Sequence, residues 1–272
     1  MGIFGESQRI VRWIVAIAAV GTLLLVLGIL LLQRSVLYPF PREARVPEQG
    51  TLLRIPHDTK TVSALFFPPT EGQCTVVFFH GNGEQLADLV PLALIYQEEG
   101  IGFFAVEYPG YGLDGEGSPS ETTIMSAAEV ALRYLHDELH IGPSSIVLQG
   151  YSLGTGVAVQ IAARGYGSKL ILLAAYTSIP DVAAAHVPWF PIRWLMLDRF
   201  DSASIASSMR IPVLLIHGTE DGIIPFHLGE QLSTFFPNAR IVSVPGAGHS
   251  FLGVPGVLED VMRFVGCGES TL

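Results

Sequence analysis

The chain has 272 residues, enough for one large α/β domain with a substantial core, and 49% of them are hydrophobic. Its formal net charge is −10, which argues against nucleic acid as a partner because phosphate binding needs a basic surface. The two cysteines, Cys74 and Cys267, form neither a disulfide framework nor a metal-ligand pattern, so we expect two ordinary thiols, with a single bridge as the alternative.

Residues 13–32 form an uncharged apolar stretch, WIVAIAAVGTLLLVLGILLL. A helix of that length spans about 30 Å, the thickness of the hydrocarbon core of a bilayer. The stretch is longer than the apolar region of a usual signal peptide, and no A-x-A-like cleavage site follows it. We therefore predict a retained single-pass transmembrane helix over 13–32, after an N-terminal flank over 1–12. A signal peptide and a buried core helix are the alternatives.

Basic groups flank this predicted helix on both sides: the α-amino group, Arg9 and Arg12 before it, and Arg34, Arg42 and Arg45 after it. The numbers of basic groups on the two sides are nearly balanced, so the positive-inside rule does not decide which side of the membrane carries the remaining chain. Residues 33–50 contain three prolines and are predicted to form an extended tether. Residues 51–272 are predicted to form the globular domain.

The globular part alternates short apolar runs with helix-forming segments. Continuous apolar runs bounded by glycine or polar residues are typical of strands buried on both faces. The predicted strands cover 64–69, 75–80, 102–108, 145–149, 169–175, 212–218 and 239–246. The predicted helices cover 84–98, 121–139, 153–164 and 250–266. This alternation predicts an α/β fold with a mostly parallel, doubly covered sheet.

The segment QGYSLGTGVA, residues 149–158, contains the pattern G-x-S-x-G around Ser152. By itself the pattern is weak, because the chain contains 29 glycines. Ser152, however, follows a predicted buried strand and precedes a predicted helix, which is the setting of a nucleophile elbow. A serine needs a base to become nucleophilic, and the base needs an acid to orient it. Asp221 and His249 follow later predicted strands in the chain order that such enzymes use.

Five segments together, FFHGNGE, YPGYG, GYSLGTGVA, LLIHGTEDGIIP and GAGHSF, resemble the α/β-hydrolase superfamily. In particular, the chain is similar to small membrane-anchored members with a single N-terminal helix. The resemblance covers nearly the whole globular part and implies an α/β-hydrolase fold with Ser152 as nucleophile, Asp221 as acid and His249 as base. It also implies an oxyanion hole made by the backbone N–H groups of Asn82 and Leu153. No cofactor and no metal are expected, because the sequence lacks phosphate-binding, dinucleotide and metal-ligand motifs.

Other ionisable residues are assigned structural roles. His80 and His217 each end a predicted strand before a glycine, where we expect them to brace loops. Glu107 also ends a strand and is expected to anchor a loop. Glu220, beside Asp221, and the more distant Asp181 are the alternatives for the acid. The histidines expected to be peripheral are His57, His136, His140 and His186.

Residues 176–211 join two predicted core strands and are too long for a tight connection. We predict a short lid over Ser152 that forms an apolar pocket for an acyl chain. The residues assigned to this pocket are Tyr151, Trp189, Phe190 and Trp194. The alternatives for the aromatic residues are a helix packed on the edge of the sheet and contact with the bilayer interface, where tryptophan is enriched.

These patterns predict a membrane-anchored serine hydrolase that cleaves carboxylic esters or thioesters of acyl lipids or small esters through an acyl-enzyme. An anchor would expose the site to acyl lipids at high local concentration. The alternatives are a serine peptidase of the same fold, which would bind a substrate amine through Glu107 or Glu116, and a non-catalytic membrane-anchored interaction module. The sequence does not determine acyl-chain length, headgroup or oligomeric state.

Overall fold

The computed structural model describes residues 3–39, 43–57, 59–115 and 117–266. Within them, the centre of the domain is an eight-stranded sheet in the order β1-β2-β4-β3-β5-β6-β7-β8. Strand β2 runs antiparallel to β1 and β4, and the other neighbouring strands are parallel. The strands are β1 (Thr51–His57), β2 (Lys60–Phe67), β3 (Thr75–Phe79), β4 (Gly102–Val106), β5 (Ile146–Tyr151), β6 (Lys169–Leu173), β7 (Val213–Gly218) and β8 (Ala239–Val244).

Helices cover both faces of this sheet, as the continuous apolar strands predict. In β3, Val77 and Phe79 belong to the core shared with α3 (Glu121–Asp137) and α4 (Leu153–Ala163), whereas Val76 and Phe78 belong to the core shared with α2 (Val90–Glu98) and α8 (Val257–Val265). The α-helices that follow the N-terminal helix are α2 (Val90–Glu98), α3 (Glu121–Asp137), α4 (Leu153–Ala163), α5 (Ile179–His186), α6 (Ala203–Ala206), α7 (Phe226–Ser233) and α8 (Val257–Val265). Short 3-10 turns are η1 (Leu86–Leu89), η2 (Gly112–Asp114), η3 (Pro143–Ser145) and η4 (Ile192–Trp194).

Three differences from the sequence-based expectations concern β1, α8 and Cys74. Strand β1, which pairs along its whole length with β2 at the edge of the sheet, was not predicted. Helix α8 begins at Val257, not at residue 250, because Gly256 takes a positive φ of 89° directly before it. Cys74 is disulfide-bonded, so the expectation of two ordinary thiols is wrong for this residue. Cys267 lies outside the described residues.

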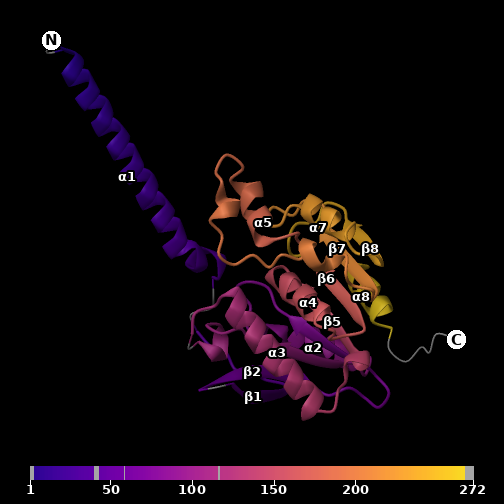
Figure 1. Cartoon of the computed structure of the whole chain (residues 1–272). Coiled ribbons are helices and arrows are strands. Elements are labelled where there is room, and N and C mark those ends of the chain that lie inside the picture. The colour runs from indigo at the N-terminus through magenta and orange to yellow at the C-terminus, as the bar shows by residue number, and fades with distance from the viewer. Residues whose placement is uncertain (1–2, 40–42, 58, 116, 267–272) are drawn as a thin grey trace.

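Helix α1 (Ile3–Leu37) projects away from the domain as one long element (Figure 1). Its segment Gln8–Leu37 is long enough to cross a bilayer; the most apolar 18-residue window in this segment has a mean hydropathy of 2.9, and none of that window is buried. The predicted apolar helix over 13–32 lies inside it. Residues 33–37, expected in an extended tether, are helical instead.

The C-terminal end of α1 is tied to the domain by polar contacts. The Gln33 side chain donates to the carbonyl of Leu195 at 3.2 Å and accepts from the N–H of Leu197 at 2.8 Å. Arg34 forms a two-pronged ion pair with buried Asp198 at 2.8 and 3.1 Å. These contacts place the end of α1 beside the segment between α5 and α6.

Candidate active site

Ser152 lies at the sharp turn between β5 and α4, with φ 52° and ψ −119°. A positive φ is strained for a residue with a side chain, and such strain is typical of a nucleophile elbow. The neighbouring backbones leave no room for side chains at the flanking glycines. A Cβ at Gly154 would overlap the carbonyl of Phe79, and one at Gly150 would overlap the carbonyl of Gly154. The two glycines of the motif are therefore needed for the close packing of β3, β5 and α4.

Three side chains from different loops meet at the carboxyl ends of the parallel strands. Asp221 follows β7, and His249 follows β8. The Nε2 of His249 lies 3.0 Å from the Ser152 hydroxyl, and its Nδ1 lies 2.7 Å from an Asp221 carboxylate oxygen. The carboxylate can only accept from Nδ1–H, which leaves Nε2 free to accept the serine proton. This arrangement can activate a serine hydroxyl as a nucleophile.

The Asp221 carboxylate is held by four groups. Its Oδ1 accepts from the N–H groups of Ile223 and Ile224, both at 2.9 Å. Its Oδ2 lies 2.7 Å from His249 and 3.3 Å from Nε2 of His217, which also donates to the Ile224 carbonyl at 2.9 Å. Burial would raise the pKa of Asp221, but these hydrogen bonds outweigh burial and hold the pKa well below its usual range. The acid therefore stays ionised, and His217 supports it as well as its own loop.

The two alternative acids lie elsewhere. Glu220 is exposed, although it is next to Asp221 in the chain. Asp181 accepts from the hydroxyls of Thr177 and Ser178 at the start of α5, and it pairs with Arg193 at 3.1 Å. In the part of the chain that the structure describes, neither carboxylate is bonded to His249.

Leu153 and Asn82, whose backbone N–H groups we expect to bind an oxyanion, both line the same cavity as Ser152. Leu153 is the first residue of α4, where N–H groups have no partner within the helix and the helix dipole favours negative charge. Asn82 lies in the loop after β3, and its side chain fixes that loop. The amide donates to the carbonyl of Leu37 at 2.7 Å, and the amide oxygen accepts from the Tyr111 hydroxyl at 2.8 Å. Among the described residues, neither N–H donates to a protein acceptor.

A buried polar cluster braces the loop that carries Asn82. Nδ1 of His80 lies 2.8 Å from the carbonyl of Gly81, and the His80 ring stacks on Tyr108 with centroids 3.9 Å apart. Burial lowers the pKa of His80 to about 4 and raises the pKa of Glu107 to about 8. The two groups face each other at 3.6 Å. Their environment matches the structural roles that we expected for both.

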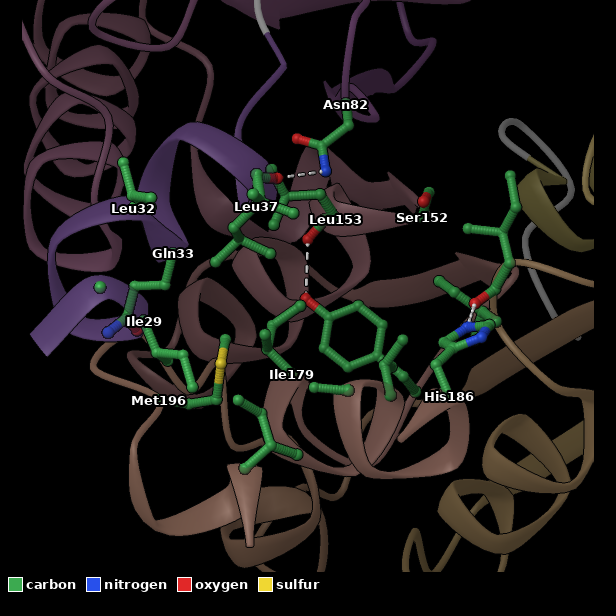
Figure 2. Close-up of a pocket in the computed structure, with 18 of the residues that line it drawn as sticks. Ile29, Leu32, Gln33, Leu37, Asn82, Ser152, Leu153, Ile179, His186 and Met196 are labelled. Carbon is green, nitrogen blue, oxygen red and sulfur yellow. Dashed lines mark hydrogen bonds between the residues drawn. The ribbon is translucent and has the colours of Figure 1, made fainter. Parts of the chain in front are cut away.

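A cavity of about 820 Å³ opens onto Ser152 (Figure 2). Its lining includes Asn82 and Leu153 and is otherwise mostly apolar, and no charged side chain is among the described residues that form it. One wall comes from α1, whose contributing residues occur in adjacent pairs four positions apart and so share one side of the helix. We call these residues the pocket face of α1: Leu24, Leu25, Gly28, Ile29, Leu32, Gln33, Val36 and Leu37.

The opposite wall comes from the segment between β6 and β7. Four residues of α5 at helical spacing line the cavity: Ile179, Val182, Ala183 and His186. Ile192 and Met196 continue this wall beyond α5. Residues of the segment predicted to be a lid thus line the same cavity as Ser152, and most of them are aliphatic.

Comparisons with known proteins agree with this architecture. The dienelactone hydrolase family model matches residues 113–255. The chain is 32% identical to the uncharacterized protein Rv2307c of Mycobacterium tuberculosis over 265 residues, which cover 93% of this chain and 92% of that protein. The chain belongs to the dienelactone hydrolase family. The prediction of an α/β hydrolase is therefore confirmed at the level of the family.

Two solved structures with a similar fold are those of Est1E and of a thermophilic esterase. Est1E of Butyrivibrio proteoclasticus with bound ferulic acid is 20% identical, with a TM-score of 0.64 over 78% of this chain and 96% of that chain. The esterase Est2 of Thermogutta terrifontis is 18% identical, with a TM-score of 0.63 over 81% of this chain and 92% of that chain. At this identity the likeness concerns the fold, and it confirms the predicted α/β-hydrolase fold.

The residues expected to line the acyl pocket do not line it. Trp189 and Trp194 are 82% and 89% exposed, and Phe190 packs edge-on against Trp189 instead of facing Ser152. The hydroxyl of Tyr151 donates to the carbonyl of His249 at 3.2 Å, so this residue braces the histidine loop. The pocket prediction is wrong for these four residues, because none of their side chains is among the described residues that line the cavity: Tyr151 ends β5, Trp189 and Phe190 follow α5, and Trp194 lies in η4.

His186, which we expected to be peripheral, lies in the cavity wall. Its Nε2 lies 2.9 Å from the carbonyl of Ile223, which is also a lining residue. The helical spacing of His186 with Ile179, Val182 and Ala183 is the sequence signal that could have placed it on this wall.

Proposed function

We propose that this protein is a membrane-anchored serine esterase that hydrolyses carboxylic esters of acyl lipids. Ser152 is the nucleophile, His249 the base and Asp221 the orienting acid. The observation that carries the proposal is the hydrogen-bonded chain Asp221–His249–Ser152 at the mouth of a large apolar cavity. A nucleophile in this position meets the carbonyl carbon of a substrate whose apolar part fills the cavity.

The reaction follows from the positions of the hydrogen-bonding groups. Ser152 Oγ attacks the ester carbonyl carbon while Nε2 of His249 takes its proton. The N–H groups of Leu153 and Asn82 stabilise the negative oxygen of the tetrahedral intermediate. His249 then gives its proton to the departing alcohol, leaving an acyl-serine. Water, deprotonated by His249, attacks the acyl-serine, and the carboxylic acid is released with Ser152 restored.

The cavity favours an acyl ester over a peptide substrate. An aminopeptidase needs an acidic group to bind the substrate amine, and no acid is among the described lining residues. Glu107 is buried and accepts from the N–H groups of Leu86 and Leu113, away from the cavity. Glu116, the other acid considered, lies outside the described residues.

Membrane anchoring rests on the exposure of α1. Large apolar side chains such as Leu23 and Leu31 are 66% and 70% exposed along this helix. Contact of such a surface with water costs about 25 cal/mol per Å², so a bilayer is the environment that its composition fits. Trp189 and Trp194, exposed beside the cavity, suit the interfacial zone of the same bilayer.

The proposal is tested with p-nitrophenyl esters from acetate to palmitate, using the full chain in detergent and its Ser152→Ala variant. Ser207→Ala, an exposed serine, is the matched control. We expect turnover and fluorophosphonate labelling in the wild type and in Ser207→Ala, and loss of both in Ser152→Ala. Full activity in Ser152→Ala would refute the assignment. A folded wild type that neither labels nor turns over would favour the interaction module.

A further inference from the structure

The wall of the catalytic cavity includes the membrane-type helix itself. The pocket face of α1 extends from Leu24 to Leu37, which corresponds to about 20 Å along the helix axis. All of this face lies within the segment Gln8–Leu37, which is long and apolar enough to cross a bilayer. A helix that only anchors an enzyme would have no reason to share a cavity with the nucleophile, so the shared wall points to a role in substrate binding.

The two ends of the cavity along α1 differ in character. At one end, the carbonyl of Leu37 accepts from Asn82, beside Leu153 and Ser152 (Figure 2). At the other end, Leu24 lies farther toward the N-terminus of α1, the helix that projects away from the domain (Figure 1). The reacting carbonyl must therefore lie at the Leu37 end, and the apolar part of the substrate extends toward Leu24.

The second wall also has features of a membrane contact. Ile192 and Met196 face the cavity, while Trp189 and Trp194 in the same segment are exposed. Gln33 joins this segment to α1 through both of its amide atoms. The two walls are thus held together near the catalytic end, with no charged group in the described lining between them.

We infer that the pocket face of α1 is the acyl-binding surface of the enzyme, and that the substrate is a bilayer lipid whose acyl chain enters laterally between α1 and the α5–η4 segment. The inference rests on the proposed function and specifies its substrate class. In this arrangement the ester lies at the membrane surface near Ser152, and the acyl chain keeps an apolar environment throughout its transfer, which avoids the cost of exposing it to water.

Two glycines of α1 provide a matched test. Gly28 lines the cavity and Gly21 does not, and a Cβ at either position would meet open space. Gly28 lies about 14 Å along the helix from Leu37, so a large side chain there would obstruct a long chain but leave room for a short one. Replacement of Gly28 or Gly21 by tryptophan adds the same bulk to the same apolar helix.

The measurement is kcat/KM for p-nitrophenyl palmitate and p-nitrophenyl butyrate with wild type, Gly28→Trp and Gly21→Trp in nanodiscs. We expect Gly28→Trp to lower the palmitate-to-butyrate ratio by about tenfold or more, since a misfit of this kind is worth at least that much, and Gly21→Trp to leave the ratio unchanged. Equal ratios in the three proteins, or equal loss of both esters in Gly28→Trp, would overturn the inference. If wild type hydrolyses neither ester and does not label with fluorophosphonate, the proposed function itself fails.

Lateral entry is tested separately with a fluorogenic palmitoyl ester of glycerol placed either in the same nanodiscs as the enzyme or in separate vesicles. We expect faster hydrolysis of the ester that shares the enzyme's bilayer at equal total concentration. Equal rates from the two sources would overturn lateral entry. The butyrate assay on the same sample shows that the catalytic groups are intact.

Discussion

Replacement of Asp221 by asparagine should disable the base without disturbing the fold. The N–H groups of Ile223 and Ile224 both donate to Oδ1 at 2.9 Å, so in Asp221→Asn the amide oxygen will occupy that position. The amide nitrogen then takes the place of Oδ2, 2.7 Å from Nδ1 of His249. Because this nitrogen only donates, His249 must accept at Nδ1 and carry its proton on Nε2, where it cannot take the Ser152 proton.

The wrong tautomer should lower kcat by about 10⁴, which corresponds to about 5 kcal/mol of transition-state stabilisation. The assay is steady-state hydrolysis of p-nitrophenyl butyrate, with thermal unfolding as the test of folding. Glu220→Gln is the control, because Glu220 is adjacent in the chain but exposed, and it should keep wild-type kcat. A folded Asp221→Asn enzyme with kcat within about tenfold of wild type would refute the role of Asp221.

Three further changes test other parts of the structure. Gly154→Ala should lower the free energy of unfolding by about 3 kcal/mol or more, because its Cβ would overlap the carbonyl of Phe79. Gly253→Ala, where a Cβ would meet open space, should leave the free energy of unfolding unchanged. Urea unfolding measures both variants. Burial raises the pKa of Glu107 to about 8, so the folded state keeps a proton that the unfolded chain loses above its ordinary value of 4.5. The contribution of Glu107 to stability should therefore fall between pH 4.5 and 8, by at most about 5 kcal/mol, whereas buried His80 contributes the opposite trend below pH 6.5. The difference between wild type and Glu107→Gln in thermal melts isolates the Glu107 contribution, and an equal slope in both proteins would contradict the assignment. Gln33→Leu removes two hydrogen bonds to the backbone of residues 195–197, each worth about 1 kcal/mol. Amide hydrogen exchange in this segment should become faster by about tenfold. An unchanged exchange rate would contradict the role of Gln33 in holding α1 to this segment.

Local sequence patterns were sufficient to predict most strands of the sheet and the order of the site residues along the chain. The strands around Ser152 are buried on both faces, so their apolar runs are continuous and easy to recognise. The edge strand β1 was missed because only Ile55 in it is buried, which leaves little apolar signal. The predicted start of α8 was too early, because helix-forming residues also precede Gly256, whose positive φ imposes a turn before the helix.

The aromatic residues of the lid segment show that a sequence pattern does not determine which way a loop side chain faces. Sequence identifies Trp189 and Trp194 as a concentrated apolar group, and such a group suits a pocket as well as a membrane surface. Which side of a loop faces Ser152 depends on how the loop packs against other elements. In the structure the aliphatic side of α5 faces the cavity, and the tryptophans face outward.

The sequence by itself determined the fold class, the elbow at Ser152 and the apolar N-terminal helix, because each depends on residues that are close together in the chain. The cavity depends on contacts between distant segments. Gln33 and Leu195, which join its two walls, are 162 positions apart, and neither lies in a periodic pattern that predicts the other. Only the tertiary structure could decide that α1 forms a wall of the cavity at Ser152, because that wall results from how the end of α1 packs on the folded domain.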